Sequence, residues 1–300
     1  GWFRPAGDAL AAGNPAAWQS FLDDTGIETT ILYPTAGLAY GLIQDREWAI
    51  ALGRAYNDWL YHEFLGRDPR FKAMALIPVH EPAAAAAELR RAVTELGLSG
   101  AVLPAATVLH KGYGHRDFDP IYAEAERLDV PLAIHGAPSK GMGFDWFDKF
   151  IQTHTLEHPV ALMIQMVSMI FDGVFDRFPR LRVAFLEAGC AWIPFMMDRL
   201  DEEFERRGAR WCPDLQRTPS ETLTSGQIWV TCEVEERSLP YVVERMGADY
   251  IMFPSDYPHE RQREQFLGDI PEFVERTDLT DEVKEKILHH NARRFYGLDR

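Results

Sequence analysis

The chain has 300 residues, of which 46% are hydrophobic and 26% charged, as in a globular protein with a large core. Its formal net charge of −15 argues against binding to nucleic acid or to an anionic membrane surface, because both would repel it. A small anionic substrate remains compatible with this charge, since an arginine or a metal ion can reverse the field within one cleft.

Short apolar runs alternate with amphipathic stretches along most of the chain, and the apolar runs predict strands. Seven such strands begin near residues 27, 71, 100, 131, 181, 228 and 250. The stretches between and around them predict helices at 15–24, 45–65, 82–96, 120–128, 159–171, 192–206, 237–246, 261–273 and 281–290.

Strands that alternate with helices pair in parallel, because each crossover returns the chain to the same edge. We therefore expect a (β/α)₈ TIM barrel, formed by residues 1–300 as a single domain. Such a barrel needs eight strands, and the helix at 15–24 has no strand before it. We expect the first strand to lie upstream of residue 1.

The three cysteines, Cys190, Cys212 and Cys232, are far apart and form no C-x-x-C motif. This argues against a disulfide framework or a structural zinc site and favours a reducing compartment. No signal peptide is recognisable at the N-terminus, and the most apolar window, 161–175, is shorter than the about 20 residues that span a bilayer. We expect a cytoplasmic protein without membrane or nucleic-acid partners.

Four predicted strands are followed by a histidine or a carboxylate, namely His80, His135, Glu187 and Asp256. In a barrel, the C-terminal ends of the strands carry the catalytic groups. Each residue alone has a structural alternative, such as capping a loop, pairing with an arginine or organising a turn. Together they indicate a metal centre or an acid–base site, because ionisable groups gathered at one rim need partners or a metal.

Four segments resemble the amidohydrolase-related family near aminocarboxymuconate-semialdehyde decarboxylase. They are Ser-Asp-Tyr-Pro-His at 255–259, Phe-Asp-Arg-Phe-Pro-Arg-Leu at 175–181, Glu-Ala-Gly-Cys-Ala-Trp-Ile-Pro at 187–194 and Asn-Ala-Arg-Arg-Phe-Tyr-Gly-Leu at 291–298. Their order and spacing carry the resemblance. It implies a barrel whose catalytic centre holds a divalent metal, most often zinc, with manganese as the alternative.

The resemblance implies that His135 is the strand-five metal ligand and Asp256 the strand-eight carboxylate. The family's other ligands come from a His-x-His or carboxylate-x-His pair on strand one, which we expect upstream of residue 1. Many relatives, including decarboxylases, have a catalytic histidine where this chain has Glu187. The glutamate resembles a branch known simply as amidohydrolases.

These features lead us to expect a metal-dependent hydrolase of a small cyclic or aromatic carbonyl or carboxylate compound. A metal would lower the pKa of a bound water, Asp256 would accept its proton, and Glu187 or a neighbour would protonate the leaving group. Three alternatives stay open. They are a non-oxidative decarboxylase of a small aromatic or enol acid, a metal-free lactonase, and a catalytically dead binding barrel.

Four further residues are candidate substrate contacts: His80, Arg199, His259 and Trp146. Arg199 resembles a family arginine that would hold a substrate carboxylate through a forked hydrogen bond, although a salt bridge on its own helix is an equal alternative.

The glycine- and aromatic-rich segment at 137–158, which includes Trp146, predicts a lid over an apolar pocket, or else a dimer contact. His154 and His158 would be lid or surface residues of this loop. The resemblance also implies a homodimer or higher homo-oligomer. We expect no nucleotide or organic cofactor, because the sequence has no P-loop or dinucleotide-binding motif.

Overall fold

A computed structural model describes residues 13–137, 139, 141–259, 261 and 263–299. Its strands are all parallel and follow the order of the chain. They are β1 (Thr30–Leu32) paired with β2 (Phe71–Ala73), and β3 (Ala75–Leu76), β4 (Ala101–Pro104), β5 (Leu132–His135), β6 (Val183–Leu186), β7 (Ile228–Thr231) and β8 (Ile251–Met252) in one six-stranded sheet.

The two sheets continue into each other through Met74, which separates β2 from β3. The backbone N–H of Met74 donates to the carbonyl of Leu32, and that of Ala75 donates to Gly100 on the other side. The seven predicted strands are therefore all present, and the expected TIM-barrel class is confirmed. Within the described residues, β8 and β1 are not paired with each other. The expected additional strand lies outside the described residues and stays a prediction.

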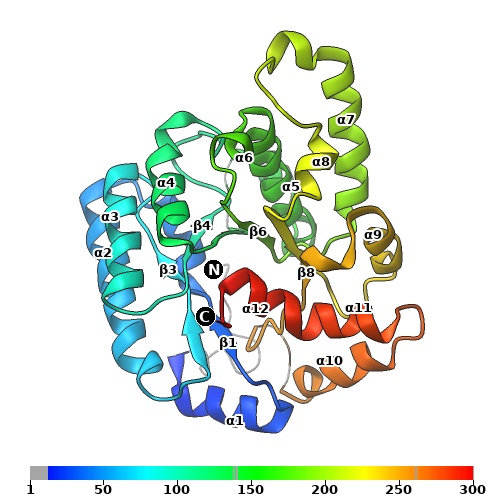
Figure 1. Cartoon of the computed structure of the whole chain (residues 1–300). Coiled ribbons are helices and arrows are strands. Elements are labelled where there is room, and N and C mark those ends of the chain that lie inside the picture. Colours follow the sequence, from blue (N-terminus) through cyan, green and yellow to red (C-terminus); the bar gives the residue numbers. More distant parts are fainter. Residues whose placement is uncertain (1–12, 138, 140, 260, 262, 300) are drawn as a thin grey trace.

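Helices surround the strands, and α7 projects away from the rest of the molecule (Figure 1). The α-helices are α1 (Pro15–Thr25), α2 (Arg46–Leu60), α3 (Pro82–Thr94), α4 (Asp119–Leu128), α5 (Phe150–Phe171), α6 (Val174–Arg177), α7 (Trp192–Trp211), α8 (Pro219–Leu223), α9 (Leu239–Met246), α10 (Arg263–Glu275), α11 (Asp281–Glu285) and α12 (Asn291–Tyr296). Shorter 3₁₀ or π turns are η2 (Ala36–Leu42), η3 (Tyr61–Leu65), η4 (Arg116–Phe118), η5 (Phe144–Trp146), η6 (Ala248–Tyr250) and η7 (Lys286–His290).

Alternation along the strands separates an inner core from an outer one. Leu132 and Ile134 of β5 belong to the core beneath the helices, whereas Ala133 belongs to the inner core of the barrel. The inner core also holds Trp229 of β7, which packs on Phe295 of α12 with ring centroids 5.2 Å apart. Since successive side chains of a strand alternate, His135 points to the same inner side as Ala133.

Helix α5 differs most from its sequence-based prediction. It begins at Phe150, where the side-chain oxygen of Gln152 accepts from the backbone N–H of Lys149 at 3.1 Å, rather than at 159, and Pro159 lies inside the helix. Proline is common in the first turn of a helix, which is why the sequence favoured a start there. His154 and His158 are therefore helical residues rather than part of a loop.

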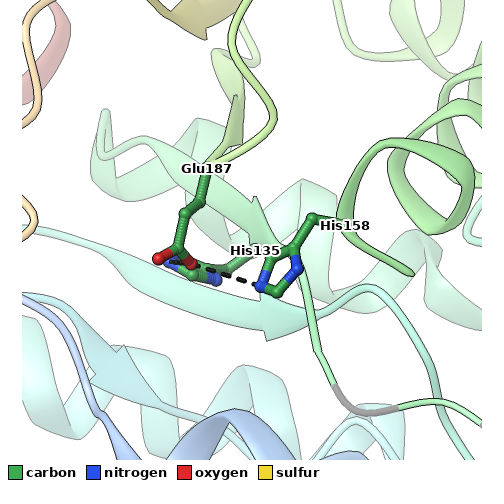
Figure 2. Close-up of side chains that lie close together, drawn as sticks. All are labelled: His135, His158 and Glu187. Carbon is green, nitrogen blue, oxygen red and sulfur yellow. Dashed lines mark ion pairs between the residues drawn. The ribbon is translucent and has the colours of Figure 1, made fainter. Parts of the chain in front are cut away.

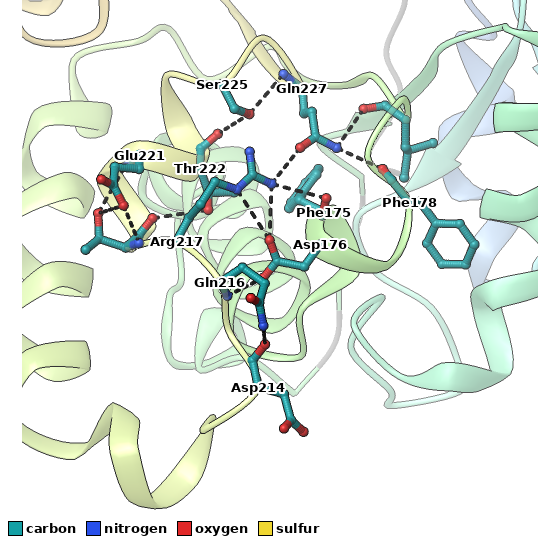
Figure 3. A network of polar contacts seen from close by, with 12 residues as sticks. Phe175, Asp176, Phe178, Asp214, Gln216, Arg217, Glu221, Thr222, Ser225 and Gln227 are labelled. Atoms are coloured by element: carbon teal, nitrogen blue, oxygen red, sulfur yellow. Dashed lines mark hydrogen bonds and ion pairs between the residues drawn. The ribbon is translucent and has the colours of Figure 1, made fainter.

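The segment at 175–181 anchors the N-terminal ends of two strands (Figure 3). Arg217 donates to the carboxylate of Asp176, at 3.3 Å, and to the side-chain oxygen of Gln227, at 2.8 Å. Gln227 is buried directly before β7, and its amide donates to the carbonyl of Phe178, ahead of β6. This family-like motif therefore has a structural role, away from the ends of the strands where the catalytic groups lie.

None of the helices in the described part of the chain is long and apolar enough to cross a membrane. The organisation as one domain and the homo-oligomer are not tested by this structure and stay predictions.

Candidate active site

The ends of β5 and β6 bring His135 and Glu187 together. The strand register pairs His135 with Leu186, so that Glu187 follows directly beside the histidine. Oε2 of Glu187 lies 2.9 Å from Nε2 of His135 and 3.5 Å from Nε2 of His158, which reaches in from α5. Figure 2 shows the carboxylate of Glu187 over the ring of His135 and facing His158. The ligand atoms of all three residues lie within 4.8 Å of one another.

A second group of ligand atoms joins Glu187 to the end of β8. Glu187, Asp256 and His259 offer atoms that also lie within 4.8 Å of one another. Nδ1 of His259 is 2.9 Å from Oδ1 of Asp256, and its Nε2 is 2.9 Å from Oγ1 of Thr35. A polar chain therefore runs from Glu187 through Asp256 and His259 to the residues that follow β1.

Packing behind the β8 loop holds Asp256 in place. Its neighbour Tyr257 is buried and stacks on Phe21 of α1, with ring centroids 4.0 Å apart and planes at 5°. Trp18 meets the same ring edge-on at 4.9 Å. The family-like motif at 255–259 thus combines a site carboxylate with an aromatic anchor.

The loop that carries Glu187 is held by another carboxylate, that of Glu236. It accepts hydrogen bonds from the backbone N–H groups of Cys190 and Ala191 at the start of α7, and from that of Glu233. Gly189 makes this approach possible, since a Cβ there would lie 2.9 Å from Oε1 of Glu236. Its φ of +57° also lies in the left-handed region that favours glycine.

A backbone contact fixes which nitrogen His135 presents to the site. Nδ1 lies 2.8 Å from the carbonyl oxygen of Gly136 and so donates to it, which leaves Nε2 facing Glu187. Burial lowers the pKa of His135, but the charge and hydrogen bond of Glu187 outweigh this and raise it overall. Burial likewise raises the pKa of Glu187, while His135 and His158 hold it well below its usual value.

The other carboxylates of the site hold protons more readily. Burial and the nearby charge of Glu187 raise the pKa of Asp256, although His259 opposes the shift. The hydrogen bond to Asp256 in turn raises the pKa of His259. Burial and the charges of Asp256, Glu236 and Glu187 raise the pKa of Glu233 to about 7. The site is therefore short of positive charge.

These residues fit a divalent cation. One imidazole nitrogen of His135, oriented by a backbone carbonyl, lies beside the carboxylate of Glu187, and Glu187 in turn is grouped with the carboxylate of Asp256. An imidazole with its second nitrogen so fixed, together with carboxylates, is a typical ligand set for zinc or manganese. A cation would also offset the mutual repulsion of the carboxylates.

The site opens into a cavity of about 970 Å³ that is lined by β1, by β8 and by residues of α2. His135, Glu187, Asp256 and His259 all line it. Its aromatic lining comes from Trp18, Tyr33, Tyr40, Tyr56, Trp59, Phe64, Phe253, Tyr257 and Tyr296. Such a mixed wall suits a ring with polar substituents.

Three of the predicted substrate contacts lie elsewhere. His80 is buried and packs edge-on against Tyr40, behind the wall of the cavity, because the chain turns there into α3. Arg199 lies on the exposed side of α7 and pairs with Glu202 and Glu203, as in the salt-bridge alternative. Trp146 is 84% exposed and does not line the cavity, so the structure does not support the predicted lid at this residue. Of the four substrate candidates, only His259 lies in the site.

Sequence reasoning missed His158, Thr35 and Glu233 as parts of the site. His158 was overlooked because 150–158 was predicted to be a loop. In a helix, its spacing of four residues from His154 places both histidines on one face. Thr35 lies three residues beyond the end of β1, so its position after a strand could have marked it as a candidate site residue. A short hydroxyl side chain is common after strands, and this made the signal weak.

A family model described as amidohydrolase matches residues 11–298. The chain is 29% identical over 288 residues to gamma-resorcylate decarboxylase from Rhizobium sp. (strain MTP-10005), covering 93% of this chain and 85% of the relative. It is 30% identical over 286 residues to 2-amino-3-carboxymuconate-6-semialdehyde decarboxylase from Dictyostelium discoideum, covering 92% and 74%.

A solved structure of 5-carboxyvanillate decarboxylase from Novosphingobium aromaticivorans, with manganese and 4-hydroxy-3-methoxy-5-nitrobenzoic acid, matches with a TM-score of 0.78 and 25% identity. The match covers 93% of this chain and 79% of the other. All three relatives are decarboxylases. The expectation of a hydrolase was therefore wrong, and it is the decarboxylase alternative that these similarities favour.

Proposed function

The chain belongs to the amidohydrolase family, and from this membership we propose that it is a metal-dependent, non-oxidative decarboxylase of a small hydroxylated aromatic acid. The observation that carries the proposal is the meeting of Glu187 and Asp256 in one cavity, with His135 and His259 paired to them. The named reactions of the relatives supply the reaction class.

We propose that His135, Glu187 and Asp256 hold the metal, with any further ligands coming from outside the described residues. Manganese fits this set well, since two of the three side chains offer carboxylate oxygens, and the 5-carboxyvanillate decarboxylase contains it. Zinc, the sequence-based expectation, is the alternative. When bound, the metal would supply positive charge that orients the substrate carboxylate and a neighbouring hydroxyl.

In the proposed reaction, the ring carbon that bears the carboxylate gains a proton and then loses CO₂. The bonding electrons stay on the ring, so one C–H bond replaces one C–C bond. Asp256 is the proposed proton donor, because it lines the cavity and lies within hydrogen-bond distance of His259, which can supply it with a proton. His259, 2.9 Å away, returns a proton to Asp256 after each turnover. Thr35 fixes the other ring nitrogen of His259.

The test is CO₂ release by the manganese-loaded protein from a panel of acids that the relatives' names suggest. The panel contains gamma-resorcylate, 5-carboxyvanillate and 2-amino-3-carboxymuconate 6-semialdehyde. In D₂O, we expect one deuteron at the carbon that lost the carboxylate, as seen by NMR. His135→Ala should abolish the release, whereas His62→Ala, at an exposed histidine of η3, should leave it intact.

Failure of the folded, manganese-loaded protein to release CO₂ from any hydroxylated aromatic acid in the panel would refute the proposal. Release that persists in His135→Ala would refute the assignment of the site. A metal titration of both proteins, run alongside, keeps these two results apart.

A further inference from the structure

Three metal-ligating side chains of α5 form a group of their own beside the site. His154, Glu157 and His158 are spaced i, i+3 and i+4, so they share one face of the helix. Their ligand atoms lie within 4.8 Å of one another, and the two imidazole rings are 5.3 Å apart. Two histidines at i and i+4 on a helix are a common zinc-binding arrangement.

The negative charge of the buried Glu157 carboxylate favours a cation in this group. The residue is only 7% exposed, and a carboxylate oxygen of it lies within 4.8 Å of a ring nitrogen of each of the two histidines. A buried carboxylate is costly unless a cation or hydrogen bonds compensate its charge. The two neighbouring imidazoles do so only when protonated, whereas a bound metal would compensate the charge with both imidazoles neutral.

The same helix opens on a cavity of about 460 Å³ that adjoins the larger cavity, since Glu187 and Glu233 line both. His154 and His158 line one side of it. Four glutamates also line it: Glu187, Glu233, Glu235 and Glu236. A cation that enters this cavity is therefore attracted by these carboxylates.

We propose that His154, Glu157 and His158 form a second divalent-cation site, and that this site takes zinc in preference to manganese. Two imidazole nitrogens and one carboxylate are the donors that zinc favours, while manganese prefers oxygen-rich sets. His158 lies 3.5 Å from Glu187, so the second cation would lie next to the first site. The inference does not depend on which acid the enzyme decarboxylates.

Zinc titration in a His135→Ala background isolates this site, because the first site then lacks its imidazole ligand. We expect His135→Ala protein to bind about one zinc ion per chain, measured by competition with a chromophoric chelator. Adding His154→Ala or Glu157→Gln should weaken this binding by more than roughly tenfold, since even residues that only support a metal ligand contribute roughly 10- to 100-fold to affinity. Adding His62→Ala, at an exposed histidine of η3, should change nothing.

Two results would overturn the proposal. One is that His135→Ala protein binds no zinc while circular dichroism shows it to be folded. The other is that zinc affinity stays unchanged in both the His154→Ala and the Glu157→Gln background. Because neither measurement uses decarboxylation, each is distinguishable from a failure of the proposed function.

Discussion

Glu187 and Asp256 both have backbone conformations that residues other than glycine seldom adopt. Their φ angles are +67° and +53°. Such conformations carry a free-energy cost and concentrate at functional sites, where the surrounding packing enforces them. The loop of Glu187 is held by hydrogen bonds that backbone N–H groups donate to Glu236. The loop of Asp256 is held by the stacking of Tyr257 on Phe21.

Asp256→Asn separates the chemistry of Asp256 from its backbone role, since asparagine tolerates the left-handed conformation. We expect decarboxylase activity to fall about 10²- to 10⁴-fold, the usual contribution of a general acid. The melting temperature should change little. The control is Asp129→Asn, at a residue with a φ of +54° that ends α4 away from the cavity. Full activity in Asp256→Asn would rule Asp256 out as the proton donor.

Gly189→Ala tests how closely Glu236 holds the loop of Glu187. The new methyl group would meet Oε1 of Glu236 in a left-handed backbone position. We expect a loss of about 1–2 kcal/mol in unfolding free energy, together with a lower kcat. Gly268→Ala in α10 meets open space, so it should be neutral or stabilise by up to about 1 kcal/mol. Equal effects of the two substitutions in urea unfolding would contradict this account.

His135, Glu187 and Asp256 could be predicted because each directly follows an apolar run, and the barrel geometry gathers such positions. His158 could not, because its contribution depends on where α5 begins. His80 met the same criterion as His135 and yet packs behind the cavity wall. Position after a strand therefore predicts the rim but not the direction of a side chain.

At the scale of elements, an ion pair between Arg90 and Glu124 joins α3 to α4. Glu124 of α4 is buried and accepts from Arg90 of α3 at 2.8 Å and from Arg127 at 2.6 Å. The hydrogen bonds of Arg127 and Arg90, opposed by burial, lower the pKa of Glu124 to about 2. The folded state therefore favours the ionised glutamate.

Glu124→Gln should lower the unfolding free energy at pH 7 by about 2 kcal/mol, less than for a fully buried pair because both arginines are more than half exposed. Since the folded-state pKa lies below the unfolded value, the stabilisation is complete above about pH 4.5 and is lost as the pH falls toward 2. Urea unfolding at pH 7, 4 and 3 should show the difference between wild type and variant shrinking. Glu95→Gln, exposed at the end of α3, is the control.

Most elements could be predicted because their signals are local. Asp45 caps α2 through the backbone N–H of Trp48, and Pro82 opens α3, so both helices begin close to their predicted starts at 45 and 82. The structure of 137–158 could not be predicted in this way. Its glycines and aromatic residues indicate a loop, whereas α5 already begins at Phe150, where Gln152 accepts from the backbone N–H of Lys149.

At the scale of the whole molecule, the candidate metal ligands come from β5, β6 and β8 and so connect distant parts of the barrel. A cation bound by His135, Glu187 and Asp256 would bind the folded state alone, since only folding gathers these residues. It would also reduce the repulsion within a chain of net charge −15. Metal binding should therefore appear as thermal stability of the entire protein.

Manganese at about 100 times its dissociation constant should stabilise the metal-free protein by about 2.7 kcal/mol, which corresponds to a rise of roughly 5 °C in melting temperature. Chelation with EDTA should reverse the rise. Scanning calorimetry of wild type and His135→Ala gives the comparison, and the variant should show a clearly smaller shift. An equal shift in both proteins would mean that manganese stabilises the fold from elsewhere, because His135 is the imidazole ligand that the proposed site cannot replace.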